Sequence, residues 1–146
     1  MARKYNERNV TSAQSTLDIS TEVVFLFDNK YQSATFLNNT GAALDLEQGI
    51  LVRRDIANAG QVIPAIAGAT LANVIGVLRV TNAETLAIAG TAKVSYAIQG
   101  ELDSGLLVLP AGVTLDTTVG AKHLKDILTG IGFDPRPVTE LTSYDN

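Results

Sequence analysis

Apolar and polar residues alternate most regularly between residues 91 and 98. The apolar positions are Ala92, Val94, Tyr96 and Ile98, and Thr91, Lys93 and Ser95 lie between them. A period of two predicts a strand with one buried face. The turn sequence Asp103-Ser104-Gly105 follows, and an apolar run then restarts at residues 106–109. The pattern therefore predicts a hairpin of residues 91–98 and 106–109.

The period changes after Pro110. Asp116 or Thr117 can cap a helix, because their side-chain oxygens accept hydrogen bonds from free amides of a first turn. Apolar residues then recur at helical spacing, at Val119, Leu124, Ile127, Leu128 and Ile131. These positions predict a short helix over about residues 117–129, with Gly130 as its natural stop at the start of Gly130-Ile131-Gly132.

Short apolar runs recur between Gly41 and Leu109, separated by turn residues such as Gly49, Gly68 and Gly90. Regular short strands with glycine turns indicate a small barrel or sandwich, because a parallel sheet would need crossover helices. We therefore expect a mainly β (α+β) fold, with a β-rich core over residues 41–132 and one C-terminal helix.

The two ends of the chain differ from this core. Residues 1–20 are polar and predict a flexible N-terminal arm, and residues 21–40 predict an extended segment rich in apolar and aromatic side chains. That segment either packs on the barrel or docks on another protein. Residues 133–146 form a tail, where Pro135 and Pro137 argue against regular strand pairing. A surface strap or a free end is expected there.

The composition fits one domain that associates with other proteins. The chain has 146 residues, of which 46% are hydrophobic and only 18% charged. A surface with few charges is easily desolvated at an interface, so self-association is expected. The net charge is −4, and the basic residues form no continuous patch. We therefore expect no nucleic-acid partner, because phosphate binding needs such a patch.

No leader or membrane segment is expected either. The basic start, Arg3-Lys4, is not followed by an apolar stretch typical of a signal peptide, and no apolar run approaches the roughly 20 residues of a membrane span. The chain has no Cys, so disulfides and thiolate metal ligands are excluded. Synthesis in the cytoplasm is the expectation.

Few residues are candidates for chemistry. His123 is the only His, and with no Cys it lacks partners for a zinc site, so we interpret it as a solvated helix residue. Two carboxylate pairs, Asp45 with Glu47 and Glu101 with Asp103, could act as acid and base or hold a hard cation, but solvated faces are the favoured interpretation. We expect no enzyme, no metal and no cofactor.

Arg53 and Arg54 are adjacent basic residues that we take as a possible interface. Arginine binds carboxylates through two parallel hydrogen bonds, so the pair could contact an acidic partner. A local ion pair with Asp55 is the more ordinary alternative.

The order of elements resembles the lambda-type head decoration proteins of tailed phages. The resemblance lies in Gly100-Glu101-Leu102 after a strand, then Leu107-Val108-Leu109-Pro110-Ala111-Gly112, a short helix and a closing Gly-Ile. Upstream, it includes the strand start at Gly49-Ile50-Leu51-Val52 and the small-residue strand over residues 72–78. It covers roughly residues 42–132, and the long N-terminal segment and the tail depart from the shorter family pattern.

The resemblance implies a capsid cement protein on the outer surface of the virion head. Members of that family sit as homotrimers on the expanded head, clamp subunits of the major capsid protein, and add an extended N-terminal strand to the shell. By that analogy the candidate arm residues are Val10, Leu17, Ile19, Val23, Phe25 and Phe27. Alternatives are another virion component, such as a tail tube protein or a second cement family, and a barrel that binds a sugar or small molecule.

Overall fold

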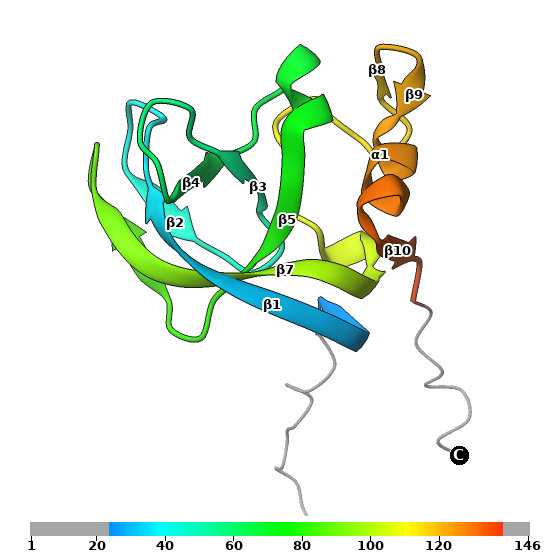
Figure 1. Ribbon diagram of the computed structural model, residues 1–146, viewed down its shortest axis with the longest axis horizontal. Coiled ribbons are helices and arrows are strands. Elements are labelled where there is room, and N and C mark those ends of the chain that lie inside the picture. Colours follow the sequence, from blue (N-terminus) through cyan, green and yellow to red (C-terminus); the bar gives the residue numbers. More distant parts are fainter. Residues whose placement is uncertain (1–23, 139–146) are drawn as a thin grey trace, which may run out of the picture.

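The computed structural model of the chain describes residues 24–138, which form a mainly β domain with one short helix (Figure 1). Five strands close into a ring, and a sixth, β10, extends the sheet beyond β7. Around the ring the order is β1 (Phe25–Leu37), β4 (Gln61–Pro64), β3 (Leu51–Arg54), β5 (Val74–Arg79) and β7 (Thr91–Asp103). Neighbours are antiparallel except β1 and β4, which are parallel. The predicted barrel-like β fold with a short C-terminal helix is confirmed.

Shorter elements complete the domain. β2 (Leu44–Leu46) pairs with β6 (Glu84–Leu86), and β8 (Thr118–Val119) pairs with β9 (Lys122–His123). The helix α1 (Leu124–Ile131) follows directly, and β10 (Phe133–Arg136) then runs parallel to the second half of β7. Two 3₁₀ turns, η2 (Ala69–Asn73) and η3 (Ser104–Leu106), precede β5 and follow β7.

Two hydrophobic clusters pack on opposite faces of a wall made of β3, β5 and β7. We call them the barrel cluster, with Phe36, Leu46, Ile50, Val52, Val62, Leu78, Leu86 and Tyr96, and the helix-side cluster, whose members include Leu51, Val77, Ala97, Leu102, Leu124, Leu128 and Phe133. Successive residues of a strand point to opposite faces, so each wall strand supplies both clusters. This explains why Leu51-Val52 of β3 and Val77-Leu78 of β5 are consecutive apolar residues rather than alternating ones.

The Tyr96 ring of β7 lies directly against Gly76 of β5. A Cβ atom on Gly76 would lie 2.3 Å from the carbonyl oxygen of Ala97 and 2.5 Å from Cδ2 of the Tyr96 ring. Only glycine lets the ring lie against the neighbouring strand at this position. The Tyr96 hydroxyl then reaches past the cluster and donates to Oε1 of Gln32 at 3.0 Å.

Asn38 fixes the end of β1 and is completely buried. Its side-chain amide donates to the carbonyl oxygens of Ala42, Leu86 and Ala87 at 2.7, 3.1 and 3.0 Å, and its Oδ1 accepts from the backbone N–H and the hydroxyl of Thr40. One side chain thus ties β1 to the loops around β2 and β6. Because every polar atom is satisfied, its burial stabilises this end of the barrel rather than weakening it.

The hairpin predicted for residues 91–98 and 106–109 is wrong. β7 continues to Asp103, whose carboxylate accepts from the N–H of Gly105 at 2.9 Å and so begins η3. The second half of β7 already has β1 on one edge and β10 on the other, so no edge is left for residues 106–109. Val108 instead donates its N–H to the carbonyl of Gly49 at 2.9 Å.

The helix also begins later than its predicted start at residue 117. The hydroxyl of Thr117 accepts from the Thr114 N–H at 2.8 Å and closes a turn, and Gly120, with φ of 66°, permits the tight β8–β9 hairpin. His123 is the residue that precedes the helix, and its N–H donates to the carboxylate of Asp126 at 3.3 Å. The helix continues past Gly130, its predicted stop, to Ile131 and is capped by Gly132, with φ of 129°.

Both ends of the described chain form strands of the main sheet, β1 and β10. The predicted arm, residues 1–20, lies outside the described residues. Of the predicted segment 21–40, residues 25–37 form β1, and Phe36 is fully buried, so the second half of this strand packs on its own barrel. The tail was expected to be unpaired, but β10 contains Pro135 and pairs with β7. An outermost strand tolerates proline where its missing N–H would face away from the ladder.

Candidate interaction surfaces

The titratable residues of the described chain do not converge on one place. No group of three or more His, Cys, Asp or Glu side chains within residues 24–138 could hold a metal ion. His123 is exposed, and its Nδ1 lies 2.7 Å from the carbonyl oxygen of Asp116. His123 is the N-cap residue of α1, immediately before the first helical residue, Leu124. Across residues 24–138, no helix is long and apolar enough to cross a membrane.

The two carboxylate pairs have separate structural partners. Asp45 accepts a hydrogen bond from the hydroxyl of Thr85 across the β2–β6 pair. Glu101 lies 3.8 Å from Arg136, whose Nε also donates to Asp134 at 2.8 Å. That hydrogen bond from Arg136 to Asp134 raises the pKa of the guanidinium. Asp103 is buried and bonds the N–H of Gly105, so it contributes to the turn rather than to a shared site with Glu101.

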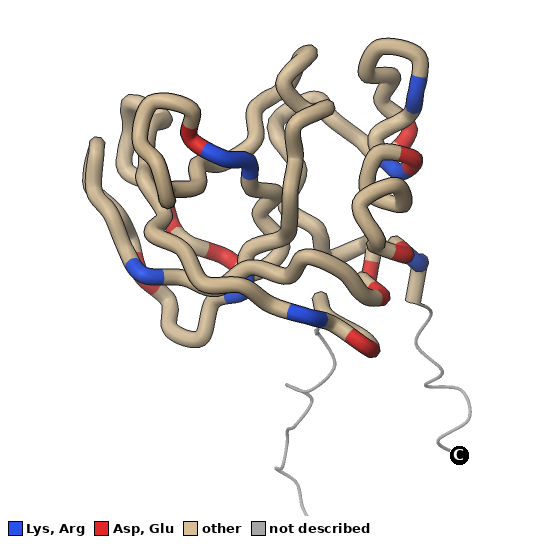
Figure 2. Tube along the Cα trace, in the orientation of Figure 1, with Lys and Arg blue, Asp and Glu red and all other residues tan. Residues whose placement is uncertain are grey.

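The charges of the described chain are scattered (Figure 2), and Arg53 and Arg54 are adjacent on β3. Arg53 is half-buried, and its Nε has no hydrogen-bond partner among the described residues. Among the described residues Asp55 forms no ion pair with Arg53 or Arg54. The Asp55 carboxylate accepts hydrogen bonds from the Asn58 amide at 2.7 Å and the Ala57 N–H at 2.9 Å, and these bonds, Asn58 first, lower its pKa, with a smaller contribution from the charge of Arg53.

The first half of β1 presents aromatic side chains at one end of the domain. Phe27 is 69% exposed and Leu26 is 38% exposed, whereas the ring of Phe25 packs edge-on against Tyr31 at 5.6 Å. Of the six residues expected in the arm, Phe25 and Phe27 lie in β1, and Val10, Leu17, Ile19 and Val23 lie outside the described residues.

The start of β1 and β10 lie on either side of the same stretch of β7. Phe25 and Pro135 both pair with Leu102, and Phe27 and Asp134 both pair with Glu101. The described chain therefore begins and ends at one end of the domain, as Figure 1 shows. Val138, the last described residue, is 51% exposed at this end. The result is an end face that carries exposed Leu26, Phe27 and Val138 beside the charged side chains of Glu101, Asp134 and Arg136, and both outer segments of the chain continue from it.

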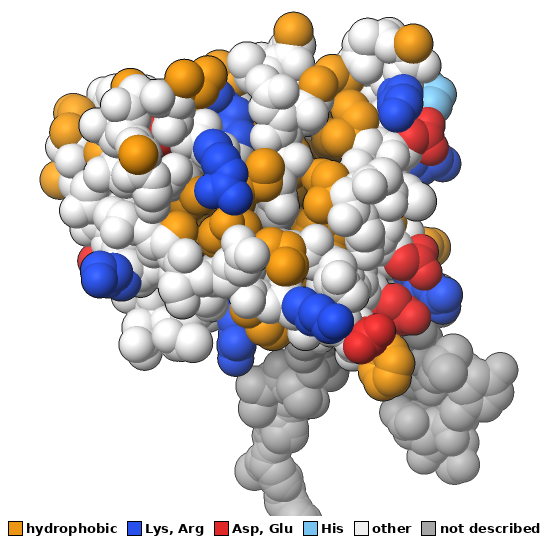
Figure 3. Space-filling view, in the orientation of Figure 1, with side chains coloured by type: hydrophobic (Ala, Val, Ile, Leu, Met, Phe, Trp, Pro, Cys, Tyr) orange, Lys and Arg blue, Asp and Glu red, His pale blue; other side chains and the backbone are white. Residues whose placement is uncertain are grey.

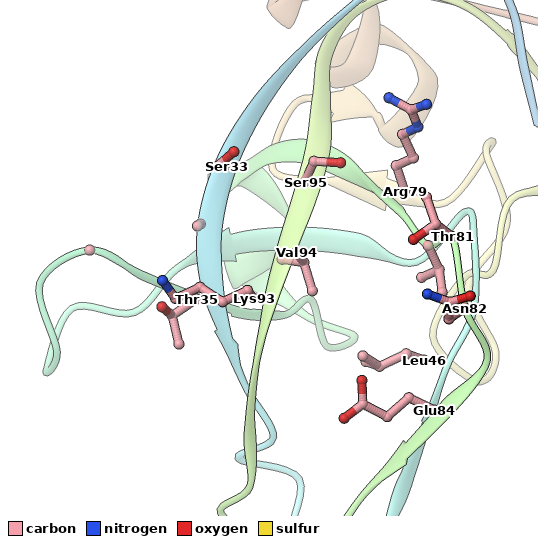
Figure 4. A pocket seen from close by; sticks show the side chains of 13 residues that line it. Ser33, Thr35, Leu46, Arg79, Thr81, Asn82, Glu84, Lys93, Val94 and Ser95 are labelled. Carbon is pink, nitrogen blue, oxygen red and sulfur yellow. The ribbon is translucent and has the colours of Figure 1, made fainter.

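A groove that the sequence did not reveal lies where β5 and β7 diverge. The two strands pair at Val77 with Ala97, Leu78 with Tyr96 and Arg79 with Ser95, and β5 then turns toward β6, which pairs with β2 instead. The opening that results has a volume of about 710 Å³ and is called the fork groove here (Figure 4). Its lining includes residues of β1, β2, β5 and β7.

The fork groove has an apolar floor and a polar rim. Its apolar lining residues, Ala34, Leu46, Val80 and Val94, belong to the barrel cluster or pack against it. The rim carries the charged side chains of Arg79, Glu84 and Lys93 and the polar side chains of Ser33, Thr35, Thr81, Asn82 and Ser95. The guanidinium of Arg79 is held 4.4 Å above the centre of the Tyr31 ring, a cation–π contact that fixes its position.

The alternation of residues 91–98 gave the correct outward face for Lys93 and Ser95, but it contained no signal that β5 would leave β7. On the face shown in Figure 3, hydrophobic side chains reach the surface between the barrel and α1, and charged side chains gather along the edge on the α1 side. Comparison with known protein families and with curated proteins found no matching family and no matching protein.

Proposed function

We propose that this protein is a structural decoration protein of a phage head, which binds the outer surface of the expanded shell as a homotrimer and stabilises contacts between major capsid protein subunits. The observation that carries the proposal is the end face, where β1 begins and β10 ends beside exposed Leu26, Phe27 and Val138 and the charged Glu101, Asp134 and Arg136. A protein that grips a shell needs a contact face, and here both outer segments of the chain continue from that face. The resemblance of residues 42–132 to lambda-type decoration proteins is the reason for proposing the major capsid protein as the partner.

The interior of the domain suits a passive clamp. The two hydrophobic clusters share one wall, and buried Asn38 locks the far end of β1. A cement protein transmits force between the subunits that it bridges, so it benefits from a close-packed interior that does not deform. The role requires neither a cofactor nor a reactive group, and the partners found for His123 and the carboxylates are structural ones.

The contact face can be tested with a matched pair of exposed residues. Replacing Phe27 by Ser removes an apolar group that is 69% exposed, so the fold should persist. Burying a Phe side chain is worth about 1.5–3 kcal/mol, so we expect affinity for expanded heads to fall roughly 10- to 100-fold. Ile56→Ser, at a residue that is 92% exposed on the β3–β4 loop, is the control and should bind normally.

Binding is measured by cosedimentation of purified protein with expanded heads of the phage that encodes it, after the oligomeric state of each variant has been checked. Wild-type protein that fails to bind those heads would contradict the capsid role itself. Equal binding by Phe27→Ser and wild type would instead remove the end face from the mechanism. Analysis of separated heads and tails distinguishes a decoration protein from a tail component.

The fork groove favours one further candidate, a barrel that binds a sugar or small metabolite. Its volume lies in the range of small-molecule sites. Its lining contains no aromatic side chain, although such sites are usually rich in them. A screen for ligands that raise the melting temperature tests this candidate, because a ligand that binds only the folded state stabilises it.

A further inference from the structure

The fork groove exposes an unpaired strand edge. From Thr91 to Val94, β7 pairs with β1 on one side, and nothing in residues 24–138 pairs with its other side, where β5 has turned away. An open edge beside an apolar floor is the geometry by which proteins accept an added strand, with backbone pairing for affinity and side-chain contacts for specificity. The groove therefore suits an extended peptide better than a compact ligand.

The rim and floor specify the chemistry of that peptide. The apolar floor of Leu46, Val80 and Val94 calls for apolar side chains at every second position. The rim holds two cations, Arg79 and Lys93, against one carboxylate, Glu84, and neither cation forms an ion pair with another described residue. A strand with one acidic residue between two apolar ones would match it.

We propose that residues 16–20 of a second copy of this chain occupy the fork groove. This segment reads Thr-Leu-Asp-Ile-Ser, so Leu17 and Ile19 share one face of an extended strand. Those two side chains cover the floor, and Asp18 between them is placed near the cations of the rim. The strand pairs with the open edge of β7 and joins neighbouring copies.

The reach of the chain requires that the segment come from a different copy. The carbonyl of Val24 accepts from the N–H of Asp103 at 2.8 Å, which fixes Val24 at the far end of β7 from the groove. Ser95, at the near end of the groove, is eight residues from Asp103, or roughly 26 Å along a strand. Ser20 is four residues from Val24, and four residues span at most about 14 Å. For Ser20 to reach the groove of its own copy, bending of β7 would have to shorten the roughly 26 Å between Asp103 and Ser95 by nearly half.

The contact between copies is separate from the proposed capsid role. It is measured on the purified protein without capsids, so its failure leaves the capsid test untouched. Residues before Thr16, including Val10, remain available to reach a shell. The proposal thus gives the two halves of the N-terminal segment different partners.

Cross-linking tests the placement directly, because the natural chain has no Cys. A Leu17→Cys copy is mixed with a Val94→Cys copy that carries a mass tag, and the mixture is oxidised. We expect a mixed disulfide dimer between the two copies. The control replaces Val94→Cys by Ile56→Cys, whose side chain is 92% exposed and outside the groove lining. Equal cross-linking to both positions, or none to Val94→Cys, overturns the proposal.

Sedimentation velocity gives a second measurement that does not depend on cysteine geometry. The double variant Leu17→Asp with Ile19→Asp should weaken self-association at least tenfold, because two charges would meet the apolar floor. Thr11→Asp with Ser12→Asp adds the same charge outside the segment and should leave association unchanged. The proposal is overturned if wild type is monomeric, or if both variants behave alike. Normal association with lost capsid binding also overturns it and assigns the segment to the shell.

Discussion

The two hydrophobic clusters lie on opposite faces of the same wall but are covered by different secondary structure. The barrel cluster is enclosed by strands whose backbone bonds close into a ring, and both β1 and β7 are 13 residues long. The helix-side cluster is covered by an eight-residue helix, a hairpin of two-residue strands and the short edge strand β10. A helix of that length is not stable by itself, so it depends on the wall. One wall therefore supports a self-contained layer and a dependent layer.

The largest effect is expected from the barrel side, at Phe36. Its ring is completely buried where β1 meets β4 and β7, so Phe36→Ala leaves a cavity at the closure of the ring. We expect a loss of about 3–5 kcal/mol in the free energy of unfolding, measured by urea denaturation. All probes should report one transition, because the ring cannot open at one strand without exposing the wall. Separate transitions for the barrel and α1 would contradict this view.

The sequence predicted the self-contained layer better than the dependent one. Alternation in residues 91–98 reflects the two faces of β7, and this local property survives in the fold. The start of the helix, the partner of residues 106–109 and the pairing of β10 all depend on which edges of β7 are free. No local sequence pattern shows which edges these are. The turn at Thr117 and the strand containing Pro135 therefore differed from expectation.

A smaller and more local effect is expected on the helix side, at Leu128. This side chain is fully buried and anchors α1 to the wall, so Leu128→Ala should cost about 2–4 kcal/mol. Hydrogen exchange should accelerate in α1 and β10, while amides paired between β1 and β7 keep their protection. The matched variant is Phe36→Ala, which should accelerate exchange in both layers. Uniform acceleration in Leu128→Ala would show that the two layers unfold together.

The candidate surfaces divide in the same way. Exposed Phe27 and the Arg53-Arg54 pair could be picked out from residue type alone. The fork groove could not, because it exists only where β5 leaves β7 to let β6 pair with β2. The residues that line it look ordinary in the sequence: Val80 and Val94 read as core, and Arg79 and Lys93 read as solvated charges. Their common feature is a position in the fold, not a motif.

The smallest effect is expected at the surface turn of the barrel layer, where Asp55 accepts hydrogen bonds from Asn58 and Ala57. These bonds hold the folded pKa of Asp55 below its ordinary value of 3.8. The carboxylate therefore stabilises the fold at pH values above 3.8, and this contribution is lost as the pH falls through the lower folded pKa. Asp55→Asn should lower the urea midpoint slightly at pH 7, because the amide keeps one acceptor but loses the charge. The difference from wild type should shrink when both proteins are unfolded near pH 3. A difference that stays constant between these two pH values would mean that the ionised carboxylate does not stabilise the turn.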